Sequence, residues 1–102
     1  MFLMEFSLAP LDQGESVSDC VAESLKIIDH SGLDYQLHSM GTTIEGELDP
    51  LLQVLKQCFE ALQNKSARIT CTAKFDYRRG HRHRLESKVT SVEEKVGRVL
   101  KK

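Results

Sequence analysis

The sequence contains no tryptophan, only two prolines and three cysteines, and no long apolar run. A membrane-spanning helix needs roughly 20 consecutive apolar residues, which no segment supplies. Cys20, Cys58 and Cys71 are far apart and odd in number, which argues against a disulfide framework and for reduced thiols that pack as small core residues. The apolar start over residues 1–10 lacks the basic region of a secretory signal and includes Glu5. We therefore expect a cytoplasmic protein.

An excess of charge of either sign is also missing. Fourteen Lys and Arg against fifteen Asp and Glu give a formal net charge of -1, so no overall field attracts nucleic acid or an acidic membrane. A chain of 102 residues with 40% hydrophobic residues has the size of one domain with its own core. We expect a single domain over residues 1–102, with a core over 1–78 and a C-terminal extension over 79–102, and neither nucleic acid nor membrane as partner.

The spacing of apolar residues predicts both strands and helices. Alternation of apolar and polar side chains predicts strands over residues 2–8, 35–39, 42–48 and 68–77. Two of the intervening segments have apolar residues at helical spacing. The resulting order of strand, helix, strand, strand, helix, strand predicts an α+β, ferredoxin-like βαββαβ sandwich, a four-stranded antiparallel sheet with two helices on one face.

Local signals predict where each helix begins. A capping box at Ser16 opens the first helix, which Gly32 ends, and Asp49 is expected to cap the second helix, with Pro50 in its first turn. A second capping box predicts that a short C-terminal helix begins at Ser91.

The two faces of the predicted sheet differ in polarity. Gly46 belongs to the helix-covered face, where the absence of a side chain lets a helix approach closely. The other face is expected to lack a covering helix, and in the usual strand order Glu5 would lie beside both Glu45 and Lys74. Its polar residues suit water, a facing subunit or a ligand; the residues of this face are Leu3, Glu5, Ser7, Thr43, Glu45, Thr70, Thr72 and Lys74.

Three segments together carry a resemblance to a known family. They are "EFSLAPL" at residues 5–11, "GESVSDCV" at 14–21 and "LHSMGTTIEGELD" at 37–49. With them the chain resembles the small thiamine-binding proteins of the YkoF-like family. The resemblance implies a ferredoxin-like subunit, dimers that pack into tetramers, and a site for thiamine or its hydroxymethylpyrimidine half.

The chemistry of thiamine suits the residues that match the family motif. Thiamine combines a cationic thiazolium ring with a flat aminopyrimidine that has both donors and acceptors. A carboxylate such as Glu45 can accept from the exocyclic amine, hydroxyls can donate or accept, and Met40 or Tyr35 can stack on a ring. We expect the pocket at the end of the sheet where the first helix begins, closed by a second subunit, with the ligand-binding residues Ser7, Met40, Gly41, Thr42, Thr43 and Glu45.

Other functions find less support in the sequence. In the segment 78–84, "RRGHRHR", His81 and His83 could seat a metal, but no cysteine or carboxylate follows at ligand spacing. A solvated or subunit-bridging loop explains this segment better than a metal site or a nucleic-acid site does. Glu5 and Glu45 could form an acid–base pair, yet no nucleophile arrangement or phosphate-binding loop is present. We expect a binding protein with no cofactor, metal or catalytic residue; the alternative is a structural or regulatory oligomer without a small-molecule ligand.

Overall fold

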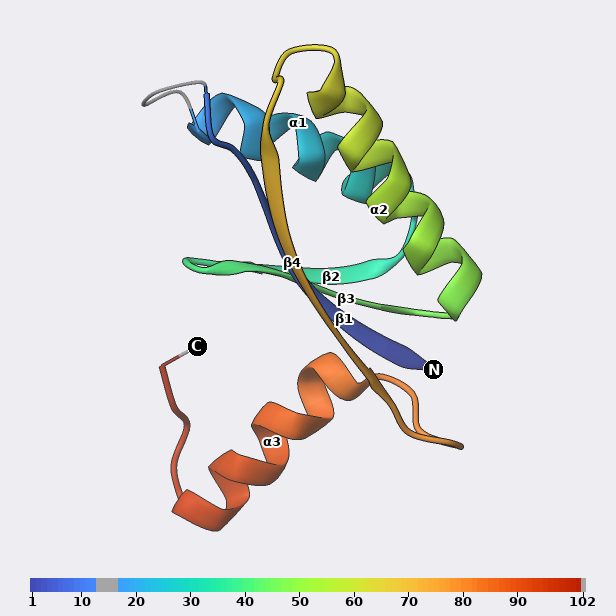
Figure 1. Ribbon diagram of the computed structural model, residues 1–102. Coiled ribbons are helices and arrows are strands. Elements are labelled where there is room, and N and C mark those ends of the chain that lie inside the picture. Colours follow the sequence, from blue (N-terminus) through green and yellow to red (C-terminus); the bar gives the residue numbers. More distant parts are fainter. Residues whose placement is uncertain (13–16, 102) are drawn as a thin grey trace.

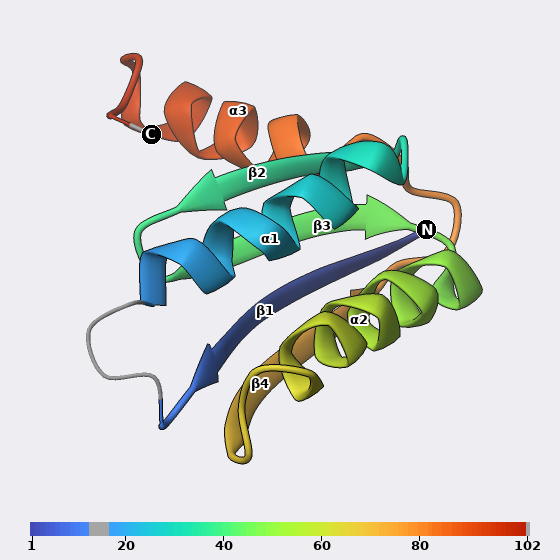
Figure 2. The ribbon, with the colours of Figure 1, turned by 90° about the horizontal axis from the view of Figure 1, so that it is seen from above.

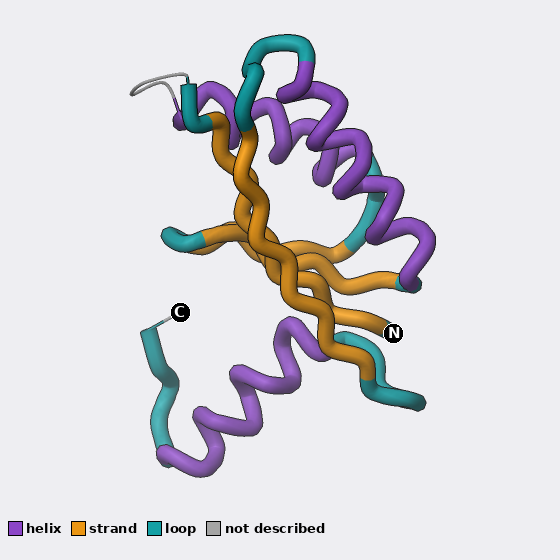
Figure 3. The backbone as a smooth tube through the Cα atoms, viewed as in Figure 1, coloured by secondary structure: helices purple, strands orange, loops and turns teal. Residues whose placement is uncertain are grey.

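The computed structural model describes residues 1–12 and 17–101 and contains four strands and three helices in that part of the chain. The elements follow the predicted order (Figures 1 and 3). This confirms the α+β, ferredoxin-like architecture. The elements are β1 (Phe2–Pro10), α1 (Val17–His30), β2 (Asp34–His38), β3 (Gly41–Gly46), α2 (Leu48–Gln63), β4 (Ile69–Tyr77) and α3 (Arg84–Val96).

The four strands form one antiparallel sheet in the order β2-β3-β1-β4. Helices α1 and α2 lie together on one face of this sheet (Figure 2). On that face Met4 lies opposite Ile44 of β3 and Phe75 of β4. The alternation of the strands places Thr43 and Glu45 on the opposite face, because their neighbours Thr42 and Ile44 face the helices.

The core lies between this helix-covered face and the two helices. Its fully buried side chains come from both layers, as the apolar spacing predicted, and are Met4, Ile28, Ile44, Leu51, Cys58 and Leu62. The three cysteines are free; Cys20 and Cys58 are buried, and Cys71 is half-buried against the core. Burial raises the pKa of the Cys58 thiol, which keeps it protonated and packed as a small apolar group.

Gly46 provides the close approach that its lack of a side chain predicted. A Cβ atom at this position would lie 3.2 Å from Cδ2 of Leu33, just after α1, and 3.6 Å from Cδ2 of Leu51 on α2. The side chains of Leu33 and Leu51 therefore pack directly on the backbone of β3 at Gly46.

The start of α2 differs from the prediction. Glu47, not Asp49, is the N-cap residue, because β3 ends at Gly46 and the helix follows at once. Asp49 lies in the first turn instead, where a carboxylate still interacts favourably with the helix dipole. Pro50 also lies near the helix start, where its missing N–H costs little. The capping box predicted at Ser16 lies outside the described residues.

The C-terminal helix shows the largest difference. It begins at Arg84, seven residues before the predicted Ser91, and it lies on the face of the sheet opposite α1 and α2 (Figure 1). The expectation that this face has no helix is therefore wrong. The half-buried Leu85 and Val89 of the first turns pack toward the sheet, whereas Val92 and Val96 are exposed. Among the described helices, none is long and apolar enough to cross a membrane.

Candidate functional site

A pocket of about 210 Å³ lies where β1, α1 and the β2–β3 hairpin meet; we call it the hairpin pocket. The sheet, the helix and the turn each supply part of its wall. Its described lining residues are Phe6, Ser7, Leu8, Ala9, Val21, Ser24, Leu25, Leu37, His38, Ser39, Met40, Gly41 and Thr42.

The hairpin pocket exists because β1 extends beyond β3. Pairing of β1 with β3 ends at Phe6 opposite Thr42, whereas pairing with β4 continues to Pro10. The Phe6 carbonyl oxygen points toward β3, since it lies 2.8 Å from the position of a Cβ on Gly41. In an antiparallel ladder every second residue turns its backbone groups to the same side. The N–H and C=O of Leu8 therefore face the pocket, on an edge of β1 that has no strand partner within residues 1–12 and 17–101.

The side chains around the hairpin pocket combine hydroxyls with apolar groups. Ser24 of α1 and Thr42 of β3 are buried, and Phe6 and Leu8 supply apolar surface. No carboxylate is found among the described lining residues. Their one ionisable side chain is that of His38, whose Nε2 lies 3.2 Å from Oγ1 of Thr43 and 3.7 Å from Oε2 of Glu5. The pocket thus suits a polar but uncharged ring.

The six residues expected to bind ligand fall into two groups. Ser7, Met40, Gly41 and Thr42 line the hairpin pocket, and the Met40 side chain is 86% exposed at its rim. Thr43 and Glu45 lie on the opposite face of the sheet and line two other hollows. Tyr35, the alternative to Met40 for stacking on a ring, donates a hydrogen bond to Asp29 across 3.1 Å and does not line this pocket.

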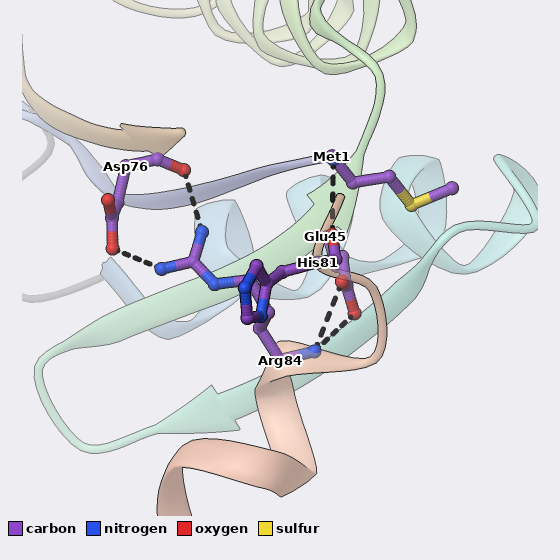
Figure 4. Close-up of polar contacts among 5 residues, drawn as sticks. All are labelled: Met1, Glu45, Asp76, His81 and Arg84. Carbon is purple, nitrogen blue, oxygen red and sulfur yellow. Dashed lines mark hydrogen bonds and ion pairs between the residues drawn. The ribbon is translucent and has the colours of Figure 1, made fainter. Parts of the chain in front are cut away.

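Glu45 holds the start of α3 on the sheet. Its carboxylate is buried, with 4% of the residue exposed, and both oxygens accept from the backbone N–H of Arg84 at 3.1 Å (Figure 4). The guanidinium of the buried Arg84 in turn donates to the carbonyl oxygen and the carboxylate of Asp76. Glu5 lies opposite Thr43 and Lys74, and the residue opposite Glu45 on β1 is Leu3.

Glu45 also belongs to a group of possible metal ligands that the sequence did not reveal. Asp34, Glu45 and His83 each offer one ligand atom, and these atoms all lie within 4.8 Å of one another. The sequence showed His83 beside His81 but no carboxylate at ligand spacing. The carboxylates come from β2 and β3, about 40 residues or more earlier in the chain, so only the position of α3 brings the three together.

Comparison with known proteins gives consistent matches over almost the whole chain. A family model described as "thiamine-binding protein" matches residues 4–93. The UPF0045 protein of Methanothermobacter thermautotrophicus is 36% identical over 99 residues, which cover 94% of this chain and 100% of the relative. The UPF0045 protein of Synechocystis is 35% identical over 92 residues, which cover 89% of this chain and 76% of the relative.

Solved structures share the fold. A hypothetical protein from Methanocaldococcus jannaschii superposes with a TM-score of 0.84 at 29% identity, over 91% of this chain and 96% of its own. A Thermotoga maritima protein provisionally assigned to thiamine biosynthesis or salvage superposes with a TM-score of 0.79 at 20% identity, over 89% of this chain and 97% of its own. The likeness to the second protein concerns the fold alone.

Proposed function

Because the chain belongs to the thiamine-binding protein family, as its resemblance to YkoF-like proteins predicted, we propose that it binds thiamine or its hydroxymethylpyrimidine moiety without catalysing a reaction. We place the ligand in the hairpin pocket. The observation that carries this assignment is that four of the six residues expected from the motif, Ser7, Met40, Gly41 and Thr42, line one pocket.

The pyrimidine half is complementary to the polar groups of the hairpin pocket. An aminopyrimidine presents an amine donor beside a ring-nitrogen acceptor, and the Leu8 backbone presents a C=O beside an N–H. Two hydrogen bonds can therefore form along the free edge of β1, as they would to an added strand. The hydroxymethyl group can reach the hydroxyl of Ser24 or Thr42, and Phe6 and Leu8 can cover the ring.

The size and charge of the hairpin pocket favour the pyrimidine half over whole thiamine. Pockets for drug-sized ligands usually measure about 300–1,000 Å³, and this one measures about 210 Å³. Its described lining residues contain no carboxylate to offset the thiazolium charge. Whole thiamine would leave its cationic ring outside the pocket, in solvent or against a second subunit.

Two neighbouring threonines on opposite faces of β3 allow a matched test of this site. We expect Thr42→Val, which removes a hydroxyl from the hairpin pocket at nearly constant volume, to weaken hydroxymethylpyrimidine binding about fivefold, because one hydrogen bond is worth roughly 1 kcal/mol. Thr43→Val should reduce the affinity less, since Thr43 does not line the pocket and reaches it only through its contact with His38. Isothermal titration calorimetry of both variants gives the comparison.

The reverse result would relocate the site. A ligand on the opposite face would contact Thr43 and the carboxylate of Glu45, as the family motif also allows. Thr43→Val and Glu45→Gln would then weaken binding, and Thr42→Val would not. If neither thiamine nor hydroxymethylpyrimidine binds while the assembly stays intact, the result would favour the structural or regulatory oligomer without a ligand.

We further propose that the protein is a cytoplasmic homo-oligomer, a dimer or a dimer of dimers. The three free thiols agree with a reducing compartment. Strand β4 is an edge of the sheet, and its Phe75 and Tyr77 are exposed, as are the valines Val92 and Val96 of α3. A second copy that covers such surfaces removes both an open strand edge and apolar area from water.

Multi-angle light scattering of the full chain tests this assembly. We expect the mass of a dimer or tetramer at micromolar concentration, compared with 11.6 kDa for one chain. A monomer at that concentration would contradict the proposal, whereas ligand binding in the hairpin pocket would remain a separate question.

A further inference from the structure

We propose that Asp34, Glu45 and His83 form a site for a divalent transition-metal ion that fastens the C-terminal helix to the sheet. Asp34 begins β2, Glu45 lies on β3, and His83 immediately precedes α3. Their three ligand atoms lie within 4.8 Å of one another. They border a hollow of about 410 Å³, which an ion and its water ligands can enter from solvent.

The two carboxylates at this place would attract a cation. Glu45 is buried, and its described hydrogen bonds come from one uncharged backbone N–H, that of Arg84. The second carboxylate, Asp34, is exposed and approaches within 4.8 Å, and two like charges at that distance repel each other. The guanidinium of Arg84 does not relieve this repulsion, because it is directed to Asp76 (Figure 4).

The side chains of Asp34 and His83 are available as ligands. Within residues 1–12 and 17–101, neither side chain has a hydrogen bond or ion pair to another residue. Both are exposed, so both can rotate. His83 adopts a left-handed backbone conformation, with φ 55° and ψ 38°, which directs the chain from the loop into α3 at the cluster.

The donor set indicates which ions fit. Two carboxylate oxygens and one imidazole nitrogen suit Zn²⁺ or Mn²⁺, whereas Ca²⁺ and Mg²⁺ favour oxygen donors alone. Bonds of about 2.1 Å to Zn²⁺ place neighbouring ligand atoms roughly 3.4 Å apart. The atoms must therefore draw together by about an ångström or somewhat more from their largest separation, which rotation of the two exposed side chains allows. A water molecule would complete the coordination.

Zinc titration of chelator-treated full-length protein tests the site. We expect one Zn²⁺ per chain with a micromolar dissociation constant, and a rise in the thermal unfolding midpoint on binding. His83→Asn and Asp34→Asn should each weaken binding at least about tenfold and abolish the thermal shift. Asparagine tolerates the left-handed backbone of residue 83, so the fold is preserved, which circular dichroism can check.

His81→Asn is the matched control, because His81 is an exposed histidine of the same loop that lies outside the cluster. This variant should bind Zn²⁺ as the parent does. Cobalt spectra add a second readout, since ligands of the proposed type give no thiolate charge-transfer band. The proposal is overturned by binding no tighter than millimolar, by equal losses in His81→Asn and His83→Asn, by undiminished binding in His83→Asn, or by a thiolate band.

Discussion

Gly41→Ala is expected to lower the free energy of unfolding by about 2–3 kcal/mol. A Cβ at residue 41 would lie 2.8 Å from the carbonyl oxygen of Phe6. That oxygen belongs to the backbone of β1 and can move only if β1 and β3 separate. For a domain of this size the loss corresponds to a fall of roughly 10–20 °C in the thermal midpoint, which circular dichroism measures directly.

Gly46→Ala is the control for this prediction. Its Cβ would meet Cδ2 of Leu33 at 3.2 Å, and that atom is the end of a flexible side chain that can shift by a few tenths of an ångström. We expect a loss below about 1 kcal/mol. Equal losses in the two variants would show that the contact with the Phe6 carbonyl is not the cause.

The same substitution at Gly41 bears on ligand binding. Gly41 lines the hairpin pocket, and the contact with Phe6 lies at the point where the pairing of β1 and β3 ends. Moving the hairpin away from β1 would alter the distance between Thr42 and the free Leu8 edge. At temperatures where Gly41→Ala remains folded, its affinity for hydroxymethylpyrimidine should therefore fall, whereas that of Gly46→Ala should not.

Most of the fold could be predicted because its signals are local. Alternating apolar residues defined the strands, and the order of elements then left few topologies. The close approach of a helix to the sheet at Gly46 was predicted from the position of this glycine in the strand pattern alone. The candidate pocket was only partly predictable: the motif named four of its lining residues, but period-two alternation divides Thr42 from Thr43, so residues adjacent in the motif lie on opposite faces of the sheet.

The C-terminal helix was misplaced because its position depends on distant contacts. The capping box at Ser91 is a strong local signal, and it led to a predicted helix start seven residues after the actual start at Arg84. What fixes that start is a backbone N–H bonded to the Glu45 carboxylate and a guanidinium bonded to Asp76. A backbone N–H has no sequence signature, and "RRGHRHR" offers four arginines of which one is buried. The group of Asp34, Glu45 and His83 was not predicted either, because only the position of α3 brings these residues together.

Asp76→Ala should be far more damaging than removal of its partner, Arg84. The side chain of Arg84 is only 5% exposed, whereas that of Asp76 is 46% exposed. Without the Asp76 carboxylate, the guanidinium of Arg84 stays buried. It keeps one uncharged acceptor at this position, the backbone carbonyl oxygen of residue 76 at 3.2 Å. An uncompensated buried charge of this kind costs about 3 kcal/mol. In Arg84→Met the carboxylate of Asp76 is solvated by water, and the hydrogen bond from the backbone N–H of residue 84 to Glu45 is kept. We therefore expect a loss of about 1 kcal/mol in the free energy of unfolding.

The loss in Asp76→Ala should be local, because the damaged contact attaches α3 and leaves the core between α1, α2 and the sheet untouched. We expect the amides over Arg84–Val96 to exchange with deuterium up to about 100-fold faster, since each 1.4 kcal/mol changes an equilibrium tenfold. Amides of β1 and β3 should keep their rates. Arg84→Met, measured beside it, should accelerate exchange in α3 by less than about tenfold. Faster exchange in Arg84→Met than in Asp76→Ala would contradict this account, and uniform acceleration across the sheet would show that α3 unfolds only together with the core.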